Sequence, residues 1–244
     1  MIDLHSHVLP GLDDGPRTLD EAVEILRAAA AEGVRTLVAT PHVREDYPTE
    51  PDEMEAALAS LRELGDGLDL RGGGEIALDW IPELERAELE RFTLGGSRTV
   101  LLEFPYFGWP LDLPEILFRL TAQGFRPVLA HPERNADVIA APERLRPLVE
   151  SGTLVQITSA SLEGRLGKTF RASALDLVDR GLAHVLASDA HTVAIRAYGL
   201  RAGAEAIDDP ALARWLTRDV PAALLADEKI PERPRRKLRF PRLR

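Results

Sequence analysis

Short apolar runs alternate along the chain with longer segments in which apolar residues recur every three or four positions. The runs predict buried β-strands, and the longer segments predict amphipathic helices that pack on them. We expect seven strands, at residues 2–5, 36–40, 68–71, 100–104, 127–130, 154–158 and 184–187. This alternation is typical of an α/β protein with a mostly parallel sheet. The pattern by itself leaves a closed barrel and an open doubly wound sheet as alternatives.

Capping signals mark the ends of several helices. Thr18 and Glu21 have the spacing of a capping box, and Gly33 follows the last apolar position, so a helix is predicted between them. Acidic pairs three residues apart predict two more helices, the first opening at Asp52 and the second at Asp112. Helical patterns near 142–150, 171–181 and 197–207 complete the alternation.

The composition fits a globular protein and narrows its chemistry. The chain has 244 residues, 45% of them hydrophobic, and a net charge of −10, so we expect no general binding of nucleic acid. It contains no cysteine, which excludes disulfides, thiolate metal ligands and a phosphocysteine intermediate. The N-terminus lacks the features of a signal peptide, and no apolar run is long enough to span a membrane. We therefore expect a cytoplasmic protein.

The C-terminal end differs from the rest of the chain. Residues 230–244 carry seven basic groups and one acid and are rich in proline and arginine. We expect residues 1–229 to form one domain and 230–244 to form a flexible basic tail. This tail is either a solvated end that folds back on the acidic body or a docking arm for an acidic partner or membrane surface. The oligomeric state is not predicted.

Side chains that can bind metals follow the ends of several predicted strands. Five of the six histidines do so, namely His5, His7, His42, His131 and His191. Acidic residues hold comparable positions, namely Asp14, Glu75, Glu103 and Asp189. In a parallel α/β barrel the carboxyl ends of the strands meet at one mouth, so these side chains would face one cavity. Imidazole and carboxylate ligands without thiolates suit Mn, Fe, Zn or Mg in a hydrolytic site.

Each of these motifs has a structural explanation when it is taken alone. The two rings of an isolated HSH segment are often surface or core residues, and Glu103 could simply pair with an arginine. The sixth histidine, His184, lies within a predicted strand and is expected to be a core or supporting residue. The joint pattern over five strand ends is far more specific than any one part.

Several motifs together resemble a known family. The segments are HSHVLPGLDDGP, ATPH, GGGE, LLEFP, LAHPERN and ASDAH, in this order from Ile2 to about Arg196. They resemble the polymerase and histidinol phosphatase (PHP) superfamily, and more narrowly the bacterial metal-dependent protein-tyrosine phosphatases encoded with capsule and exopolysaccharide genes. The resemblance implies a distorted (β/α)7 barrel, similar to a TIM barrel, with the active site at the carboxyl ends of the strands.

The resemblance also implies the roles of individual residues. It assigns as metal ligands His5, His7, Asp14, His42, Glu75, Glu103, His131, Asp189 and His191. These would hold two or three divalent ions, manganese first, with Fe, Zn or Mg as alternatives. Arg134 and Arg196 would contact phosphate, and Asp189 and His191 would take part in catalysis. Two departures from the usual pattern, Thr192 after ASDAH and Asn135 after HPER, put substrate preference in doubt more than catalysis.

The implied function is hydrolysis of phosphotyrosine monoesters in proteins by a metal-activated hydroxide, which would regulate a tyrosine kinase of polysaccharide export. Three divalent ions would change the charge of the nine ligands from −4 to about +2, which favours phosphate binding. One alternative is a small-molecule phosphatase or phosphodiesterase acting on sugar, histidinol or nucleotide phosphates. Another is a catalytically silent binding module, which would be expected to lack ligands.

An aromatic segment follows Glu103 and bears on substrate choice. Residues Tyr106, Phe107 and Trp109 lie in the sequence FPYFGWP, which should stand beside the barrel mouth. They form either an aromatic wall for a phosphotyrosine ring or a loop that packs on itself around its prolines.

Overall fold

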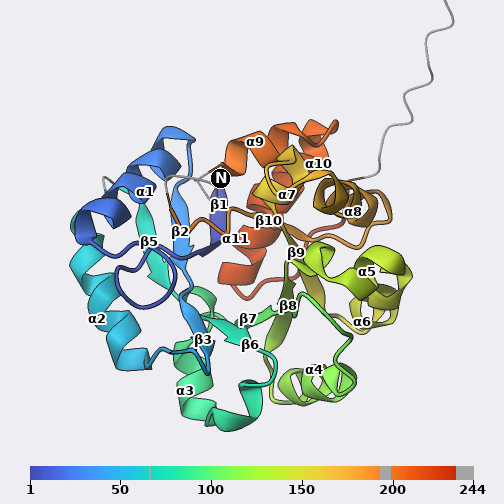
Figure 1. The fold of residues 1–244 in the computed structure, drawn as a ribbon, viewed down its shortest axis with the longest axis horizontal. Helices are drawn as coiled ribbons and strands as arrows, with labels where there is room; N and C mark the ends of the chain where they lie inside the picture. Colours follow the sequence, from blue (N-terminus) through green and yellow to red (C-terminus); the bar gives the residue numbers. More distant parts are fainter. Residues whose placement is uncertain (66, 193–198, 235–244) are drawn as a thin grey trace, which may run out of the picture.

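Strands occupy the centre of the molecule, and helices are arranged around them (Figure 1). The computed structural model describes residues 1–65, 67–192 and 199–234. The strands are β1 (Ile2–Ser6), β2 (Thr36–Ala39), β3 (His42–Arg44), β4 (Tyr47–Pro48), β5 (Asp69–Gly72), β6 (Glu75–Ala77), β7 (Thr99–Glu103), β8 (Arg126–Ala130), β9 (Leu154–Thr158) and β10 (Val185–Ala187).

The α-helices are short and follow the strands along the chain. They are α1 (Leu19–Ala31), α2 (Pro51–Arg62), α3 (Arg86–Arg91), α4 (Leu113–Ala122), α5 (Ala136–Ala140), α6 (Arg146–Glu150), α7 (Ser159–Glu163), α8 (Lys168–Asp179), α9 (Leu200–Glu205), α10 (Pro210–Arg214) and α11 (Val220–Leu225). Single turns of 3-10 helix lie at Ile81–Glu83, Leu94–Gly96, Pro132–Arg134 and Pro142–Leu145, and a π-helical turn spans Trp215–Asp219. No helix in these parts of the chain is both long and apolar enough to cross a lipid bilayer.

The strands form two sheets that are almost entirely parallel. The smaller sheet has the order β1-β2-β5, and the larger has the order β10-β9-β8-β7-β6-β3-β4, in which only β3 and β4 pair antiparallel. The two sheets touch where β1 ends, because Ser6 forms a parallel bridge with Ala190 after β10. The predicted α/β class with parallel strands is confirmed.

All seven predicted strands are present, and three short strands were not predicted. Strands β3, β4 and β6 have three residues or fewer, which is too short for an alternation of apolar and polar positions to emerge. Two of them, β3 and β6, begin where the chain has just crossed from the smaller sheet to the larger one. The chain leaves β2 and enters β3 after two residues, and it leaves β5 and enters β6 in the same way.

Helix starts agree with the capping signals to within two residues. Thr18 and Glu21 form the predicted capping box of α1, each side chain accepting a hydrogen bond from the backbone of the other. Helix α2 begins at Pro51, capped by Glu50 and Glu53 rather than from Asp52. Asp112 precedes α4 as predicted, but its side chain makes no capping hydrogen bond, so the first turn of α4 relies on packing.

The described beginning of the basic tail packs on the body of the protein. The Arg233 guanidinium donates to the backbone carbonyls of Val178 and Ala183 at 2.6 and 2.9 Å, and it lies over the ring of Trp215. These contacts attach the beginning of the tail to the last turn of α8 and to the segment before β10. Residues 235–244, the remainder of the predicted tail, lie outside the described residues.

The core extends directly beneath the polar strand ends. Phe92 is fully buried, and its backbone carbonyl accepts a hydrogen bond from the amide of Gly74 at 2.9 Å. A Cβ placed on Gly74 would lie only 2.9 Å from Cδ1 of Phe92, so the ring packs against the backbone immediately before Glu75. A side chain in this position supports both the core and the segment that carries Glu75.

We predict that Phe92→Ala lowers the free energy of unfolding by about 3–5 kcal/mol, because it removes a buried ring and leaves a cavity. Urea denaturation followed by circular dichroism measures this change. Phe118→Ala on α4 is the matched control, since this ring is 73% exposed, and it should shift stability by no more than about 0.5 kcal/mol. Equal losses in the two variants would contradict the assignment of Phe92 to the core.

Candidate metal centre

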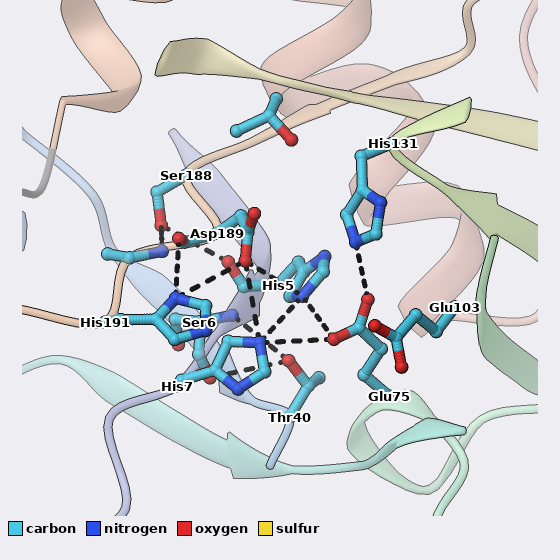
Figure 2. A network of polar contacts seen from close by, with 12 residues as sticks. His5, Ser6, His7, Thr40, Glu75, Glu103, His131, Ser188, Asp189 and His191 are labelled. Atoms are coloured by element: carbon cyan, nitrogen blue, oxygen red, sulfur yellow. Dashed lines mark hydrogen bonds and ion pairs between the residues drawn. The ribbon is translucent and has the colours of Figure 1, made fainter. Parts of the chain in front are cut away.

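The polar strand ends of both sheets converge on one cluster (Figure 2). His5 and Glu103 are at or next to the last residues of β1 and β7, whereas His42 and Glu75 begin β3 and β6, immediately after the crossings between the sheets. His131 follows β8. The cluster is completed by the residues that follow β1 and β10, which are His7, Asp14, Asp189 and His191.

Glu75 is at the centre of this cluster. Its side chain is fully buried, and Oε2 lies 3.3 Å from Nε2 of His5, 3.3 Å from Nε2 of His7 and 3.0 Å from Nδ1 of His42. Its other oxygen, Oε1, lies 2.7 Å from Nε2 of His131. Burial alone would raise the pKa of the Glu75 carboxyl, but the surrounding imidazoles hold it well below its usual range.

The side chains form three overlapping groups in which one donor atom from each residue lies within 4.8 Å of the others. The groups share members, so several ions could be bound side by side. They consist of His7, Asp14, His42 and His191, then of His5, His7 and Glu75, and finally of His42, Glu75 and Glu103. Every donor is an imidazole nitrogen or a carboxylate oxygen, and such ligands suit Mn, Fe, Zn or Mg, whereas softer metals select thiolate or thioether ligands.

The geometry around Glu75 fits a shared cation better than it fits hydrogen bonds. Oε2 of Glu75 and Nδ1 of His42 are buried, and neither makes a hydrogen bond of normal geometry with a described residue despite their close approach. Nε2 of His5 and Nε2 of His7 also face each other at 3.0 Å, where at most one can donate. Such convergence of lone pairs is stabilised when a divalent ion lies between them.

Two residues that the sequence patterns did not single out orient the histidines. Oδ2 of Asp13 accepts from Nδ1 of His7 at 2.6 Å and from the amide of His42 at 3.0 Å. Oε1 of Gln156 accepts from Nδ1 of His5 at 2.9 Å. Because these oxygens can only accept, both Nδ1 atoms carry the proton and both Nε2 atoms are free to bind an ion. In the sequence, Asp13 could have been recognised as the first acid of the pair in GLDDGP, and Gln156 as the amide within the buried strand β9.

Asp189 connects the histidines to Arg134. Oδ1 of Asp189 lies 3.5 Å from Nε2 of both His5 and His7, and Oδ2 accepts from the guanidinium of Arg134. Arg134 also donates to Oγ1 of Thr158 at 2.7 Å and is almost fully buried. Burial by itself would raise the pKa of Asp189, because it favours the neutral acid, but Arg134 and the imidazoles hold the pKa well below its usual range.

Two residues of the cluster adopt a strained backbone. His131 has a φ of 39° and Asp189 a φ of 52°, in the left-handed region that side chains with a Cβ rarely occupy. The fold holds both in place: the amide of His131 donates to the carbonyl of Gln156, and the amide of Asp189 donates to the carbonyl of His5. Strain of this kind is concentrated where function requires a side-chain direction that a relaxed backbone would not provide.

An arginine not found by the sequence patterns lies on the open side. Arg44 donates from Nη1 to Oε1 of Glu103 at 2.8 Å and is partly exposed. Arg44 lies two residues after His42 in β3, and this spacing is the feature of the sequence that could have identified it. Burial and the charge of Glu75 raise the pKa of Glu103, and Arg44 opposes the shift. Arg196, the second predicted phosphate contact, lies outside the described residues.

In the aromatic segment, Tyr106 contacts the cluster, whereas Trp109 packs on the body of the protein. The ring of Tyr106 stacks on His131 with centroids 6.2 Å apart, and its hydroxyl lies 3.5 Å from Nη1 of Arg134. Phe107 is 84% exposed. Trp109 packs edge-on against Phe104 and under the guanidinium of a surface arginine.

Asn135, one of the two departures from the usual family pattern, ties this loop down. Its Nδ2 donates to the carbonyls of Pro105 and Gly108 at 2.8 and 2.9 Å. Its Oδ1 caps α5 by accepting from the amide of Val138. The side chain therefore positions Tyr106 beside His131.

His184 is the sixth histidine; it lies apart from the cluster and accepts a hydrogen bond from the amide of Val155.

In the absence of metal the cluster retains protons. Burial favours neutral rings, but the carboxylates around His5 and His42 outweigh it and raise the pKa of His5 to about 9 and that of His42 to about 11. His131 differs, because burial and the nearby Arg134 lower its pKa to about 4. A divalent ion bound through these nitrogens would have to displace the protons from His5 and His42.

Comparison with known proteins supports this picture. The family model described as "Capsular polysaccharide synthesis, CpsB/CapC" matches residues 1–217. Tyrosine-protein phosphatase YwqE of Bacillus subtilis is 38% identical over 208 residues, which is 80% of this chain and 79% of YwqE. Tyrosine-protein phosphatase CpsB of Streptococcus pneumoniae is 33% identical over 205 residues, covering 79% of this chain and 84% of CpsB.

A solved structure resembles the fold over almost its whole length. It comes from work on YwqE of Bacillus subtilis and CpsB of Streptococcus pneumoniae, described as unique metal-dependent tyrosine phosphatases. It superposes with a TM-score of 0.85 at 32% identity and covers 97% of this chain and 100% of its own. The family model, the relatives and the shared structure agree, and the chain belongs to the CpsB/CapC family of capsular polysaccharide synthesis.

Proposed function

We propose that the chain is a metal-dependent protein-tyrosine phosphatase that hydrolyses phosphotyrosine monoesters. The observation that carries this proposal is the set of three overlapping ligand groups around Glu75, directly beside the buried guanidinium of Arg134. Its relatives YwqE and CpsB are tyrosine-protein phosphatases, which favours phosphotyrosine over other phosphate esters as the substrate.

We also propose that the strands form a distorted (β/α)7 barrel. If β2 with β3 and β5 with β6 each count as one interrupted strand, the chain has the seven strands that such a barrel needs, with β4 as an addition. The parallel bridge from Ser6 to Ala190 supports closure between β1 and β10. In this arrangement the active site lies at the carboxyl ends of the strands, which is supported by His5, Glu103 and His131 at or next to the ends of β1, β7 and β8.

The ligand groups fit two or three divalent ions, and we propose manganese as the first choice. His191 would serve as a ligand through Nε2, because its Nδ1 faces the carbonyl of Asp189 at 3.0 Å and must donate to it. His131 would bind through one ring nitrogen while its ring stacks on Tyr106. When bound, the ions supply Lewis acidity and activate water for attack on phosphorus.

The residues of the chain orient the phosphate and the tyrosine ring. Arg134 would hold non-bridging phosphate oxygens, with Asp189 and Thr158 fixing the plane of its guanidinium. Arg196 would add a second guanidinium. Tyr106 and Phe107 would form the wall for the substrate ring, and Trp109 would support their loop from behind.

The family description connects this chemistry to capsular polysaccharide synthesis. We therefore propose that the physiological substrate is a phosphotyrosine protein of polysaccharide export, in particular its tyrosine kinase, and that the chain acts in the cytoplasm. The basic end of the chain is a candidate docking arm for that protein.

Metal removal tests the centre directly. We predict that chelated protein loses hydrolysis of p-nitrophenyl phosphate and regains it with Mn, and that the affinity for Mn rises from about pH 6 to about pH 9. The sign follows from the pKa of His5, which is raised to about 9: the ring is protonated in metal-free protein below that pH, and metal binding must displace this proton. Titration calorimetry in buffers of different ionisation enthalpy counts the released protons. A flat affinity profile without proton release would count against these ligands.

Loss of a single ligand should abolish activity. We predict that His131→Ala and Asp189→Asn each lower kcat on p-nitrophenyl phosphate by about 100-fold or more, because each contacts the centre while the core remains intact. His184→Gln is the matched control, since this half-buried histidine contacts Val155 and Trp215, outside the cluster. Near-normal kcat in either site variant, with the fold retained by circular dichroism, would remove that residue from the centre.

Tyr106 should distinguish aromatic from aliphatic phosphate esters. We predict that Tyr106→Ala lowers the ratio of kcat/KM for a phosphotyrosine peptide to that for a phosphoserine peptide by about 10-fold, because ring stacking is lost. Tyr106→Phe keeps the ring and removes only the hydroxyl near Arg134, so its ratio should stay close to that of the unmodified protein. If Tyr106→Ala leaves the ratio unchanged, the aromatic wall is not formed by this side chain.

A further inference from the structure

A cavity of about 600 Å³ opens beside the candidate metal centre. It is lined by residues of the β3–β4 connection and by the segments that follow β6 and β7. It shares Arg44 and Glu103 with the polar cluster, and Tyr106 and Phe107 form part of its wall. The cavity is therefore continuous with the place where a phosphotyrosine ring would lie. It is too large to be filled by that ring alone, since pockets of this size hold whole small ligands.

The cavity has an excess of negative charge. Among the described residues, Arg44 is the only basic residue of its lining, and the Arg44 guanidinium forms ion pairs with Glu103 and Asp46 at 2.8 Å each. The lining also includes Glu45, Asp79 and Asp112, which are exposed. Within the described ranges, none of these three carboxylates has a basic side chain within the 4.0 Å of an ion pair.

These acids are in the wrong place to help bind phosphate. A phosphate dianion approaching the metal centre is repelled by Glu45, Asp79 and Asp112, so they would weaken the binding of a small phosphate ester. They become favourable when the substrate brings its own positive charges to the cavity. The cavity thus complements a cationic group attached to the phosphate ester, at some distance from the phosphate.

Apolar side chains at the same edge indicate that the occupant is partly apolar. Phe107 is 84% exposed where it lines the cavity, and Leu111, which lies in the chain between the lining residues Pro110 and Asp112, is 92% exposed. Large apolar residues that project into water beside a binding site are typical of surfaces that contact a polypeptide. An extended peptide can supply both apolar and cationic side chains over a short length.

We propose that this cavity is the docking groove for the peptide that flanks the phosphotyrosine, and that Glu45, Asp79 and Asp112 select substrates with lysine or arginine next to that tyrosine. This proposal rests on the proposed phosphatase function and deepens it. The metal centre and Arg134 recognise the phosphate, whereas the groove recognises the sequence around it.

The size of the effect follows from the exposure of these charges. A solvent-exposed ion pair changes affinity by up to about 5-fold, so three carboxylates acting together should change kcat/KM by about 10-fold or more. The effect should fall mainly on KM, because these three carboxylates are not among the proposed metal ligands or phosphate contacts. It should also weaken with added salt, since these charges lie in water.

The test compares two phosphotyrosine peptides that differ only in charge, one with lysines on both sides of the tyrosine and one with glutamates there. The metal-loaded full chain should hydrolyse the lysine peptide with a kcat/KM at least about 10-fold higher. In the triple variant Glu45→Gln, Asp79→Asn, Asp112→Asn, this preference should fall about 10-fold. The ratio of kcat/KM on the lysine peptide to that on p-nitrophenyl phosphate should fall with it. Each single variant should show about a 2-fold part of the change, in case the triple variant folds poorly.

The control variant Glu24→Gln, Glu63→Gln, Glu205→Gln removes the same number of negative charges from exposed positions in or directly after helices, outside the cavity. It should keep the full preference for the lysine peptide. An equal fall in both triple variants would show that net charge, and not the groove, sets the preference, and this would overturn the proposal. So would an unmodified protein that does not distinguish the two peptides.

Two further outcomes separate the groove from the phosphatase function. If p-nitrophenyl phosphate is hydrolysed but the peptides are not distinguished, the groove proposal fails and the proposed function stands. If no metal restores hydrolysis of p-nitrophenyl phosphate, the proposed function fails and the groove proposal fails with it. If the groove variant alters p-nitrophenyl phosphate and both peptides equally, the acids act on the phosphate end, which also overturns the groove.

Discussion

The buried carboxylate of Glu75 is the group on which the rest of the polar centre depends. A charge with no exposure to water is very costly unless positive groups or ions surround it. Four imidazoles from three different segments meet this requirement, and each must have a particular nitrogen facing inward. Asp13 and Gln156 set that orientation for His7 and His5 from the other side of the rings. Asp13 and Gln156 therefore determine which ring nitrogen of His7 and His5 faces Glu75.

The arrangement of the strands brings the residues of this centre together. The crossings from β2 to β3 and from β5 to β6 place His42 and Glu75 opposite each other in one sheet, in direct register. The strained backbone of His131 and Asp189 is tolerated at the same place, because hydrogen bonds to neighbouring strands hold both residues. Irregularities that would weaken an ordinary sheet are concentrated where the side chains must converge.

In the two proposals, positive charge recognises the phosphate and negative charge recognises the peptide around it. The centre would gather positive charge from ions and from Arg134 to bind a phosphate, while the neighbouring groove presents carboxylates to the chain that carries it. Opposite fields at adjacent positions orient a substrate as well as hold it, because a reversed peptide would meet repulsion at both ends. Such an arrangement favours an extended phosphopeptide over an isolated phosphate ester.

The sequence by itself determined seven of the strands and singled out the histidines and acids that the structure brings together. Apolar runs of four or five residues are local signals, and a histidine or acid after a buried run stands out without knowledge of its neighbours. Only the tertiary structure decided which of these side chains touch. The short strands β3 and β6, the roles of Asp13, Gln156 and Arg44, and the separation of Tyr106 from Trp109 all depend on contacts between distant segments. His5 and Gln156, for example, are 151 residues apart. Such contacts leave no periodic trace in the sequence, because the packing of the whole chain sets their geometry.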